Sequence, residues 1–210
     1  QNRIGASIRL MLGTGMRIGE CLGLTWQSCK FDTGEIIVDH TLNYRKQEDG
    51  HCRHYVEFLP KTIAGIRSIP MFDEVRAALL EEKERQDRVG TADTVINGLS
   101  DWVFTNRHGT VFKPKSINAA ITRICKAYNE AECEAAKVEG REPFLLPHFT
   151  CHQLRHTFCT RLCEVEPRPK IVQAIMGHAK IETTMDVYAE VEERAKKEAA
   201  VRVQGVIFIK

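Results

Sequence analysis

The stretch TCHQLRHTFCTRLC, from Thr150 to Cys163, is predicted to form one helix that ends before Pro167-Arg168-Pro169. His152 and Arg155 are three residues apart, so they share one face of this helix. Three interpretations are open: a zinc site using His152, His156 and a cysteine, an anion site using His152 and Arg155, and a helix with one buried histidine. Arg155 argues against a nearby divalent cation. It favours a phosphate, which a guanidinium can hold by two parallel hydrogen bonds.

Further segments with chemistry-bearing residues lie on either side of this helix. Met176-Gly177-His178 ends ten residues before Tyr188, and the turn Gly13-Thr14-Gly15 precedes Arg17. Taken singly, each is ordinary: a glycine that ends a helix, a tyrosine of the core, and a surface arginine near a helix start. Their combination and order along the chain carry the information.

The rest of the chain shows both helical and strand periodicity. Helices are expected over residues 4–12, 75–88 with Asp73 as N-cap, 116–136, 170–176, 182–189 and 190–200. Strands are expected over residues 35–38, 41–44, 55–59 and 66–70, and again over the apolar end of the chain, 201–209. The predicted fold class is therefore α+β: mostly α-helical, with a small three-stranded antiparallel sheet on one edge.

Composition sets wide limits. The 210 residues suffice for one large domain or two small ones, and 43% hydrophobic with 28% charged residues is typical of a soluble globular protein. The net charge of +2 does not by itself indicate a nucleic-acid binder, so local charge must decide. No apolar run approaches the roughly 20 residues of a membrane span. The eight cysteines form no CxxC pair and are interpreted as reduced and cytosolic.

Four motifs occur in order: Gly13 to Leu24 around Arg17, His152-x-x-Arg155-His156-Thr157, Met176-Gly177-His178, and Thr183-x-x-x-Val187-Tyr188. Over nearly the whole chain this set resembles the catalytic domain of the tyrosine recombinase (phage integrase) family. Leu59 to Thr62 and Gly65 to Pro70 resemble the integrases of conjugative transposons in particular. The resemblance implies the catalytic fold of that family. It also implies site-specific recombination, the integration and excision of a mobile element, through a 3′-phosphotyrosine.

The resemblance assigns a role to each matching residue. Arg17 and Arg155 would stabilise the charge that a phosphodiester gains in the transition state. His152 and His178 would donate to phosphate oxygens or handle the proton of the nucleophile. Lys61, on a turn between two predicted strands, would protonate the departing 5′ oxygen.

Lys46 is a competing candidate for the general acid, but it belongs to a longer polar insertion. Tyr188 would be the nucleophile. Only about one phenol in a thousand is ionised at pH 7, so we expect the positive field of Arg17, Arg155 and the histidines to assist it. Glu20 either orients Arg17 or is a surface carboxylate. The scheme needs no metal and no cofactor.

DNA contacts are expected along a basic stretch without acidic residues and in the polar insertion between the strands: Lys113, Lys115, Ser116, Asn118, Arg123, Lys126, Arg45 and Lys46. The expected partners are double-stranded DNA recombination sites, further copies of the chain in a tetramer, and an excision factor, with no membrane. The expected location is the bacterial cytoplasm, at the nucleoid.

Residues 1–189 are assigned to the catalytic domain and 190–210 to a helix and strand tail that docks between subunits. The N-terminal DNA-binding domains of the family are expected to be absent from this fragment. Three alternatives remain: a topoisomerase with the same chemistry that attaches to a 3′ phosphate, a non-catalytic DNA-binding or excision-control protein of the same fold, and a zinc-dependent regulator that uses the cysteines and histidines.

Overall fold

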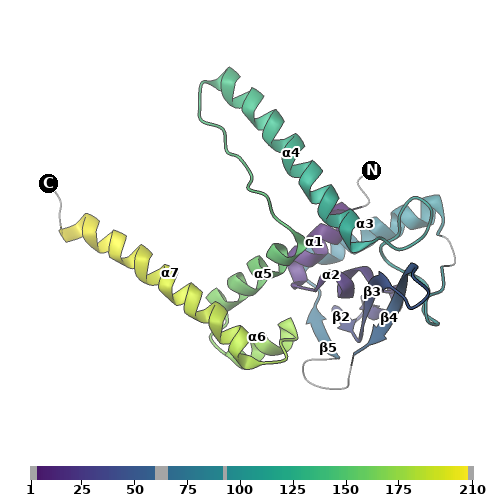
Figure 1. Ribbon diagram of the computed structural model, residues 1–210. Helices are drawn as coiled ribbons and strands as arrows, with labels where there is room; N and C mark the ends of the chain where they lie inside the picture. The colour runs from purple at the N-terminus through teal and green to yellow at the C-terminus, as the bar shows by residue number, and fades with distance from the viewer. Residues whose placement is uncertain (1–3, 60–65, 92–93, 208–210) are drawn as a thin grey trace.

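The computed structural model describes residues 4–59, 66–91 and 94–207, with side chains as far as Val203. A body of helices and strands forms the N-terminal half, and two long helices extend away from it (Figure 1). The helices are α1 (Gly5–Thr14), α2 (Ile18–Leu22), a short 3₁₀ helix (Trp26–Ser28), α3 (Asp73–Val89), α4 (Pro114–Glu139), α5 (Cys151–Val165), α6 (Pro169–Met176) and α7 (Ile181–Ile207). The strands are β1 (Cys29–Lys30), β2 (Glu35–Val38), β3 (His40–Lys46), β4 (Cys52–Phe58) and β5 (Arg67–Pro70).

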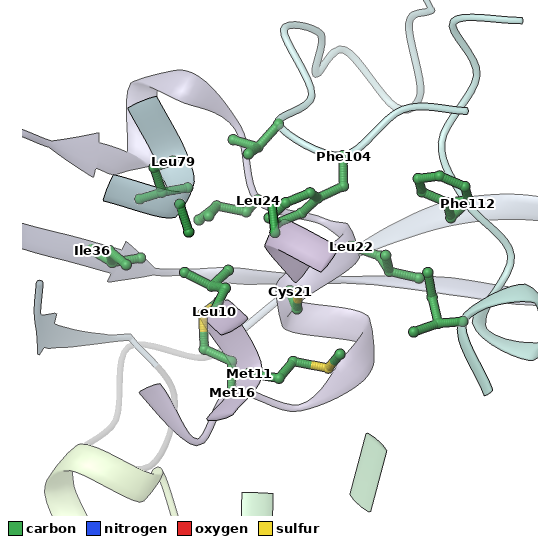
Figure 2. Packing of buried hydrophobic residues seen from close by; sticks show 14 of the residues in the cluster. Leu10, Met11, Met16, Cys21, Leu22, Leu24, Ile36, Leu79, Phe104 and Phe112 are labelled. Carbon is green, nitrogen blue, oxygen red and sulfur yellow. The ribbon is translucent and has the colours of Figure 1, made fainter. Parts of the chain in front are cut away.

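The body is organised around one large hydrophobic core. Leu10 of α1, Leu22 of α2, Ile36 of β2, Leu79 of α3 and Phe104 are completely buried there (Figure 2). Residues from four elements and one connecting segment thus meet at the same place. Removing this much apolar surface from water fixes how the helices lie on the strands.

The strands form two antiparallel sheets rather than one. β2 lies between β1 and β5, while β3 pairs with β4 as a separate hairpin. Asp39 lies between β2 and β3, and its carbonyl accepts a hydrogen bond from Leu59 N at 2.8 Å. The α+β class with a small antiparallel sheet is confirmed. The single sheet predicted from residues 35–70 divides because the chain leaves β2 at Asp39 and begins a new hairpin.

A second, smaller core joins the C-terminal helices. Cys159 and Cys163 of α5, Val172 and Met176 of α6, and Val187 of α7 are buried together. Both cysteines that could have served a metal site therefore lie in an apolar cluster. All eight cysteines of the chain are free thiols.

The C-terminal end differs from its predicted structure. α7 runs without a break from Ile181 to Ile207. The helices expected over residues 182–189 and 190–200 are therefore one helix. The strand expected over residues 201–209 is wrong for 201–207, and the last three residues lie outside the described range. The intervening residues, rich in Glu, Lys, Arg and Ala, are strong helix formers. An established helix adds residues more easily than a new element starts, which carries the helix into the Val-rich end. No helix in the described ranges is long and apolar enough to cross a membrane.

Candidate active site

Arg17 is held by the turn between α1 and α2. Gly15 ends α1 in the left-handed conformation, with φ +65°, and a Cβ there would come within 2.5 Å of the Phe158 ring. Glycine is therefore required both for the turn and for the close approach of α5. The Arg17 side chain, 47% exposed, extends from this turn as the N-cap of α2.

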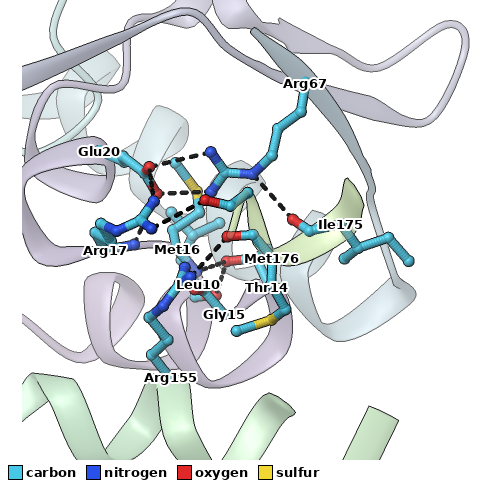
Figure 3. Close-up of polar contacts among 11 residues, drawn as sticks. Leu10, Thr14, Gly15, Met16, Arg17, Glu20, Arg67, Arg155, Ile175 and Met176 are labelled. Carbon is cyan, nitrogen blue, oxygen red and sulfur yellow. Dashed lines mark hydrogen bonds and ion pairs between the residues drawn. The ribbon is translucent and has the colours of Figure 1, made fainter. Parts of the chain in front are cut away.

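Arg155 connects this turn to the end of α6, where the motif Met176-Gly177-His178 begins. Its side chain is buried on α5, where Nη1 donates to Gly15 O and Nη2 to Met176 O, both at 2.6 Å (Figure 3). Burial and the positive charge of Arg17 lower the pKa of Arg155 to about 10. The guanidinium remains charged at neutral pH, but its surroundings are short of negative charge.

Glu20 supplies the negative charge of this site. Its buried carboxylate accepts hydrogen bonds from Arg17 N at 2.8 Å and Arg17 Nη1 at 2.9 Å, and two more from Arg67. Burial would raise the pKa of the Glu20 carboxyl, but the hydrogen bonds and charges of Arg67 and Arg17 outweigh burial and lower it. The alternative of a surface carboxylate is wrong, and the contact with Arg17 is the one expected of an orienting residue.

Arg67 was missed by the sequence analysis, which treated it as an ordinary strand residue. The burial of β5 alternates, so Arg67 and Ile69 face the interior while Ser68 and Pro70 face outward. That alternation was the available signal, since it puts a charged residue on the inner face of a strand. We call Arg17, Arg67, Arg155 and Glu20 the arginine cluster: Arg17 and Arg67 hold the Glu20 carboxylate, and Arg155 bonds to main-chain carbonyls beside them (Figure 3).

His178 lies next to the arginine cluster. It follows Gly177, which ends α6 with φ +62° and whose carbonyl accepts a hydrogen bond from Arg17 Nη2 at 3.0 Å. The buried imidazole pairs through Nδ1 with Thr184 Oγ1 at 2.9 Å. Burial, followed by the charges of Arg155, Arg17 and Arg67, lowers the pKa of His178 to about 4. His178 is therefore neutral at pH 7 and can donate one ring proton without adding charge.

Tyr188 does not lie in the positive surroundings that were expected for it. It lies part-buried on α7 against the smaller core, and its hydroxyl donates to the main-chain carbonyl of Glu166, between α5 and α6. Burial, with Cys163 and Glu166 adding to it, raises the pKa of the Tyr188 phenol. The expected assistance from a positive field is thus not found in this arrangement, because the hydroxyl lies beside a carbonyl and apolar groups.

Two predicted catalytic residues remain, His152 and Lys61. His152 is exposed in the first turn of α5, one turn before the buried Arg155. Lys61 lies outside the described residues. A zinc site has no support from the geometry, since His152 and His156 are exposed while Cys159 and Cys163 lie in the smaller core. No group of three metal-ligating side chains occurs in the part of the chain that the structure describes.

The residues expected to contact DNA lie on α4 and on the β3–β4 hairpin. Five of the six on α4 and its N-cap are exposed, namely Lys113, Lys115, Ser116, Arg123 and Lys126, and Arg45 and Lys46 are exposed on β3. Lys113 Nζ lies 4.9 Å from the centre of the Tyr44 ring, which brings the hairpin and the start of α4 together.

Asn118 has an internal contact instead. Its Oδ1 accepts a hydrogen bond from Cys151 N at 3.0 Å, so it caps the first turn of α5. The contact joins the beginning of α4 to the beginning of α5, the helix that carries Arg155. Asn118 therefore has a structural explanation that its position in a basic stretch did not indicate.

An exposed arginine beside buried arginines and a neutral histidine, in a mostly helical domain, is a site suited to an anionic group such as a phosphate. Comparison with known proteins is more specific. The family model described as "Phage integrase family" matches residues 2–194, and the chain belongs to this family. The expected resemblance to tyrosine recombinases is confirmed.

Three relatives illustrate the match. The transposase from transposon Tn916 of Enterococcus faecalis is 36% identical over 185 residues, covering 87% of this chain and 41% of that protein. A XerC-like tyrosine recombinase of Caldanaerobacter subterraneus subsp. tengcongensis is 28% identical over 204 residues, covering 94% and 48%. The structure of the Tn1549 transposon integrase with transposon right end DNA has a TM-score of 0.74 at 34% identity, covering 92% of this chain and 57% of that one. The chain spans about half the length of the curated relatives it matches.

Proposed function

We propose that this chain is the catalytic part of a site-specific recombinase that cuts and rejoins DNA strands during integration and excision of a mobile element. The observation that carries the proposal is the arginine cluster: Arg17 and Arg67 pair with one buried carboxylate, a third guanidinium, Arg155, lies within their electrostatic reach, and Arg17 is half exposed. The excess positive charge suits a phosphodiester, whose charge grows in the transition state. Transposon proteins among its relatives support the mobile element.

The proposed reaction has two steps. The Tyr188 oxygen attacks the phosphorus, a bond forms between them, and the bond from phosphorus to the 5′ oxygen breaks. The 3′ phosphate is then joined to Tyr188, and the 5′ oxygen leaves with a proton from Lys61. In the second step a 5′ hydroxyl of another strand attacks the phosphotyrosine and releases Tyr188. Each step exchanges one phosphate ester for another, so no external energy source is required.

Each remaining residue has a part in the first step. Arg17 and Arg155 hold the non-bridging oxygens, with Arg17 the more accessible of the two. His178 and His152 donate to the phosphate or accept the phenol proton. The Tyr188 hydroxyl must first release the Glu166 carbonyl before its oxygen can reach the phosphorus. We therefore expect α7 to shift before the attack.

DNA would lie along α4 and the β3–β4 hairpin. Their exposed cations are suited to phosphate contacts: Lys113, Lys115, Arg123, Lys126, Arg45 and Lys46. Ser116 adds a hydroxyl for a neutral hydrogen bond. The Tn1549 integrase structure, which holds transposon end DNA, supports this class of partner.

The active form would be a tetramer on two recombination sites, in the bacterial cytoplasm at the nucleoid, with an excision factor as a further partner. Residues 1–189 form the catalytic domain in this proposal. Residues 190–210 form the tail that docks on a neighbouring subunit, and the distal part of α7 extends from the body as such a tail requires (Figure 1). Truncation after Ala189 is expected to weaken assembly more than folding. Unchanged assembly on DNA would argue against docking by the tail.

The proposal is tested with a pool of nicked DNA duplexes of random sequence, in which the short cleaved piece diffuses away and traps the covalent product. DNA that becomes joined to the protein is recovered, sequenced and used as the common substrate. Tyr188→Phe is expected to abolish the covalent product, whereas Tyr128→Phe, an exposed tyrosine on α4, is expected to retain it. A product that survives Tyr188→Phe would exclude Tyr188 as the nucleophile.

A further inference from the structure

Two buried arginine–glutamate pairs occur in the described part of the body, but only one touches the candidate site. Arg67 and Glu20 have side chains 4% and 2% exposed, with Nη1–Oε1 at 3.0 Å and Nη2–Oε2 at 2.7 Å. Arg85 and Glu82 on α3 have side chains 8% and 3% exposed, with Nε–Oε2 at 2.9 Å. Both pairs are bidentate, but only the first shares its carboxylate with Arg17.

Glu20 transmits the position of Arg67 to Arg17. Each Glu20 oxygen accepts one hydrogen bond from Arg67 and a second from Arg17. Oε1 accepts from Arg17 Nη1 at 2.9 Å, and Oε2 accepts from Arg17 N at 2.8 Å. Arg17 is half exposed, and an exposed long side chain would otherwise sample many rotamers. The fixed carboxylate therefore selects one orientation of the Arg17 guanidinium.

Arg67 also fixes the turn that carries His178. Its Nε donates to Ile175 O at 2.9 Å. Its guanidinium packs directly against Gly177, where an added Cβ would lie 2.8 Å from Nη1 and 2.9 Å from Cζ. Arg17 Nη2 donates to the carbonyl of the same glycine. One buried side chain therefore contacts both the carboxylate that holds Arg17 and the carbonyl of Ile175 (Figure 3), and so braces the Arg17 turn and the end of α6 that precedes His178.

We propose that Arg67 is a positioning residue for strand cleavage, acting through Glu20 on Arg17 and through Ile175 and Gly177 on His178. Arg67 is given no contact with the DNA phosphate, because all three of its guanidinium nitrogens donate to Glu20 or Ile175 O inside the protein. Arg155, which is also buried, differs in that its hydrogen bonds to the described residues use Nη1 and Nη2 and leave Nε for a phosphate oxygen. This inference rests on the proposed function. It adds a residue on β5 to a set otherwise made of Lys61 and residues of the four motifs.

The test separates rate from binding. Formation of the covalent product is followed at increasing concentrations of the selected nicked duplex. Arg67→Lys keeps the charge but loses the forked contact, so its maximal rate should fall about 10- to 100-fold through misplacement of Arg17 and His178. The DNA concentration that gives half the maximal rate should stay unchanged, because no phosphate contact is lost.

Arg85→Lys is the matched control. It breaks a second buried pair and should lower the melting temperature of the chain while leaving the maximal cleavage rate intact. Glu20→Gln, which keeps the shape of the side chain, should lower the maximal rate as Arg67→Lys does. The double variant should lose less than the product of the two single effects, since both act on one contact.

The outcomes are distinguishable. A wild-type maximal rate in folded Arg67→Lys, or a loss confined to the half-saturating DNA concentration, overturns the positioning role. If Arg67→Lys does not fold, Glu20→Gln decides by the same two criteria. Absence of covalent product with the unaltered chain overturns the proposed function, and the positioning role with it.

Discussion

Arg155 and Tyr188 belong to the same proposed reaction, but they are held in different ways. Arg155 is buried and bonded to the carbonyls of Gly15 and Met176, so it links the ends of α1 and α6. Tyr188 lies on the helix that extends away from the body, and its hydroxyl donates to the Glu166 carbonyl. The proposed phosphate-binding side is preformed by the core, whereas the position of the proposed nucleophile depends on how α7 lies. The proposed reaction would therefore require movement on one side only.

The preformed side is most sensitive at Arg155. Arg155→Lys cannot reach both carbonyls, so the transition state loses a directed donor and cleavage should slow about 100- to 1,000-fold. The rate of covalent product formation measures the loss. Arg161→Lys, on the exposed side of the same helix, should be neutral. Equal rates for both variants would contradict a preformed arginine side.

Substitution in the turn that holds Arg17 is expected to have the next largest effect, on the free energy of unfolding. Gly15→Ala forces alanine into a left-handed backbone, at about 1–2 kcal/mol, and pushes Cβ to within 2.5 Å of Phe158. Gly140→Ala is the matched control, because Gly140 has φ +66° with open space around it and so incurs the backbone cost alone. Denaturant unfolding of both variants should show a larger loss at Gly15. A similar loss at the two glycines would mean that α5 does not press on the turn.

His178 gives the preformed side a pH dependence. Its pKa of about 4 in the folded chain lies below the ordinary value of 6.5, so the unfolded chain binds more protons between these pH values. Stability should therefore be complete above pH 6.5 and decline as the pH falls towards 4, by at most about 3 kcal/mol. Unfolding of His178→Gln should show a flatter profile over this window. A profile as steep as that of the unaltered chain would place the titration elsewhere.

The smallest effect concerns the nucleophile before DNA binds. The pKa of Tyr188 is raised, because burial and the neighbouring Cys163 and Glu166 disfavour the phenolate. ¹³C NMR of ring-labelled tyrosine, with Tyr188→Phe to assign the signal, should show Tyr188 titrating above its ordinary value of about 10. Titration below that value would show that the positive field already acts on Tyr188 without DNA.

Prediction from sequence succeeded where a local pattern was decisive. The helix from Thr150, the long α4 and the strands near residues 35 and 67 follow from periodicity and turn residues, and their positions agree within a few residues. The failures have two physical causes. Strand pairing depends on contacts between distant segments, so one sheet was predicted where two form. At the C-terminus, valines suggested a strand, although the preceding helix continues through them.

In the candidate site, too, some residues were identified from the sequence and others only from the structure. The motifs around Arg17, Arg155 and His178 were identified in the sequence, and the structure brings them together through hydrogen bonds to main-chain carbonyls. The alternation of β5 could have indicated that Arg67 is buried, but not that it belongs to the site, because its partners Glu20 and Ile175 are 47 and 108 residues away. The bond between Tyr188 and the Glu166 carbonyl has no sequence signal, since any residue offers a carbonyl.

The sequence by itself determined which residues could bind and attack a phosphate, because guanidinium, imidazole and phenol chemistry is a property of the side chains and their order identified the family. Only the tertiary structure decided which arginines are buried, which carboxylate and carbonyl groups hold them, and where the tyrosine hydroxyl lies. Burial and hydrogen-bond geometry arise when distant segments pack together. They set the pKa of Arg155, His178 and Tyr188, and no local pattern specifies them.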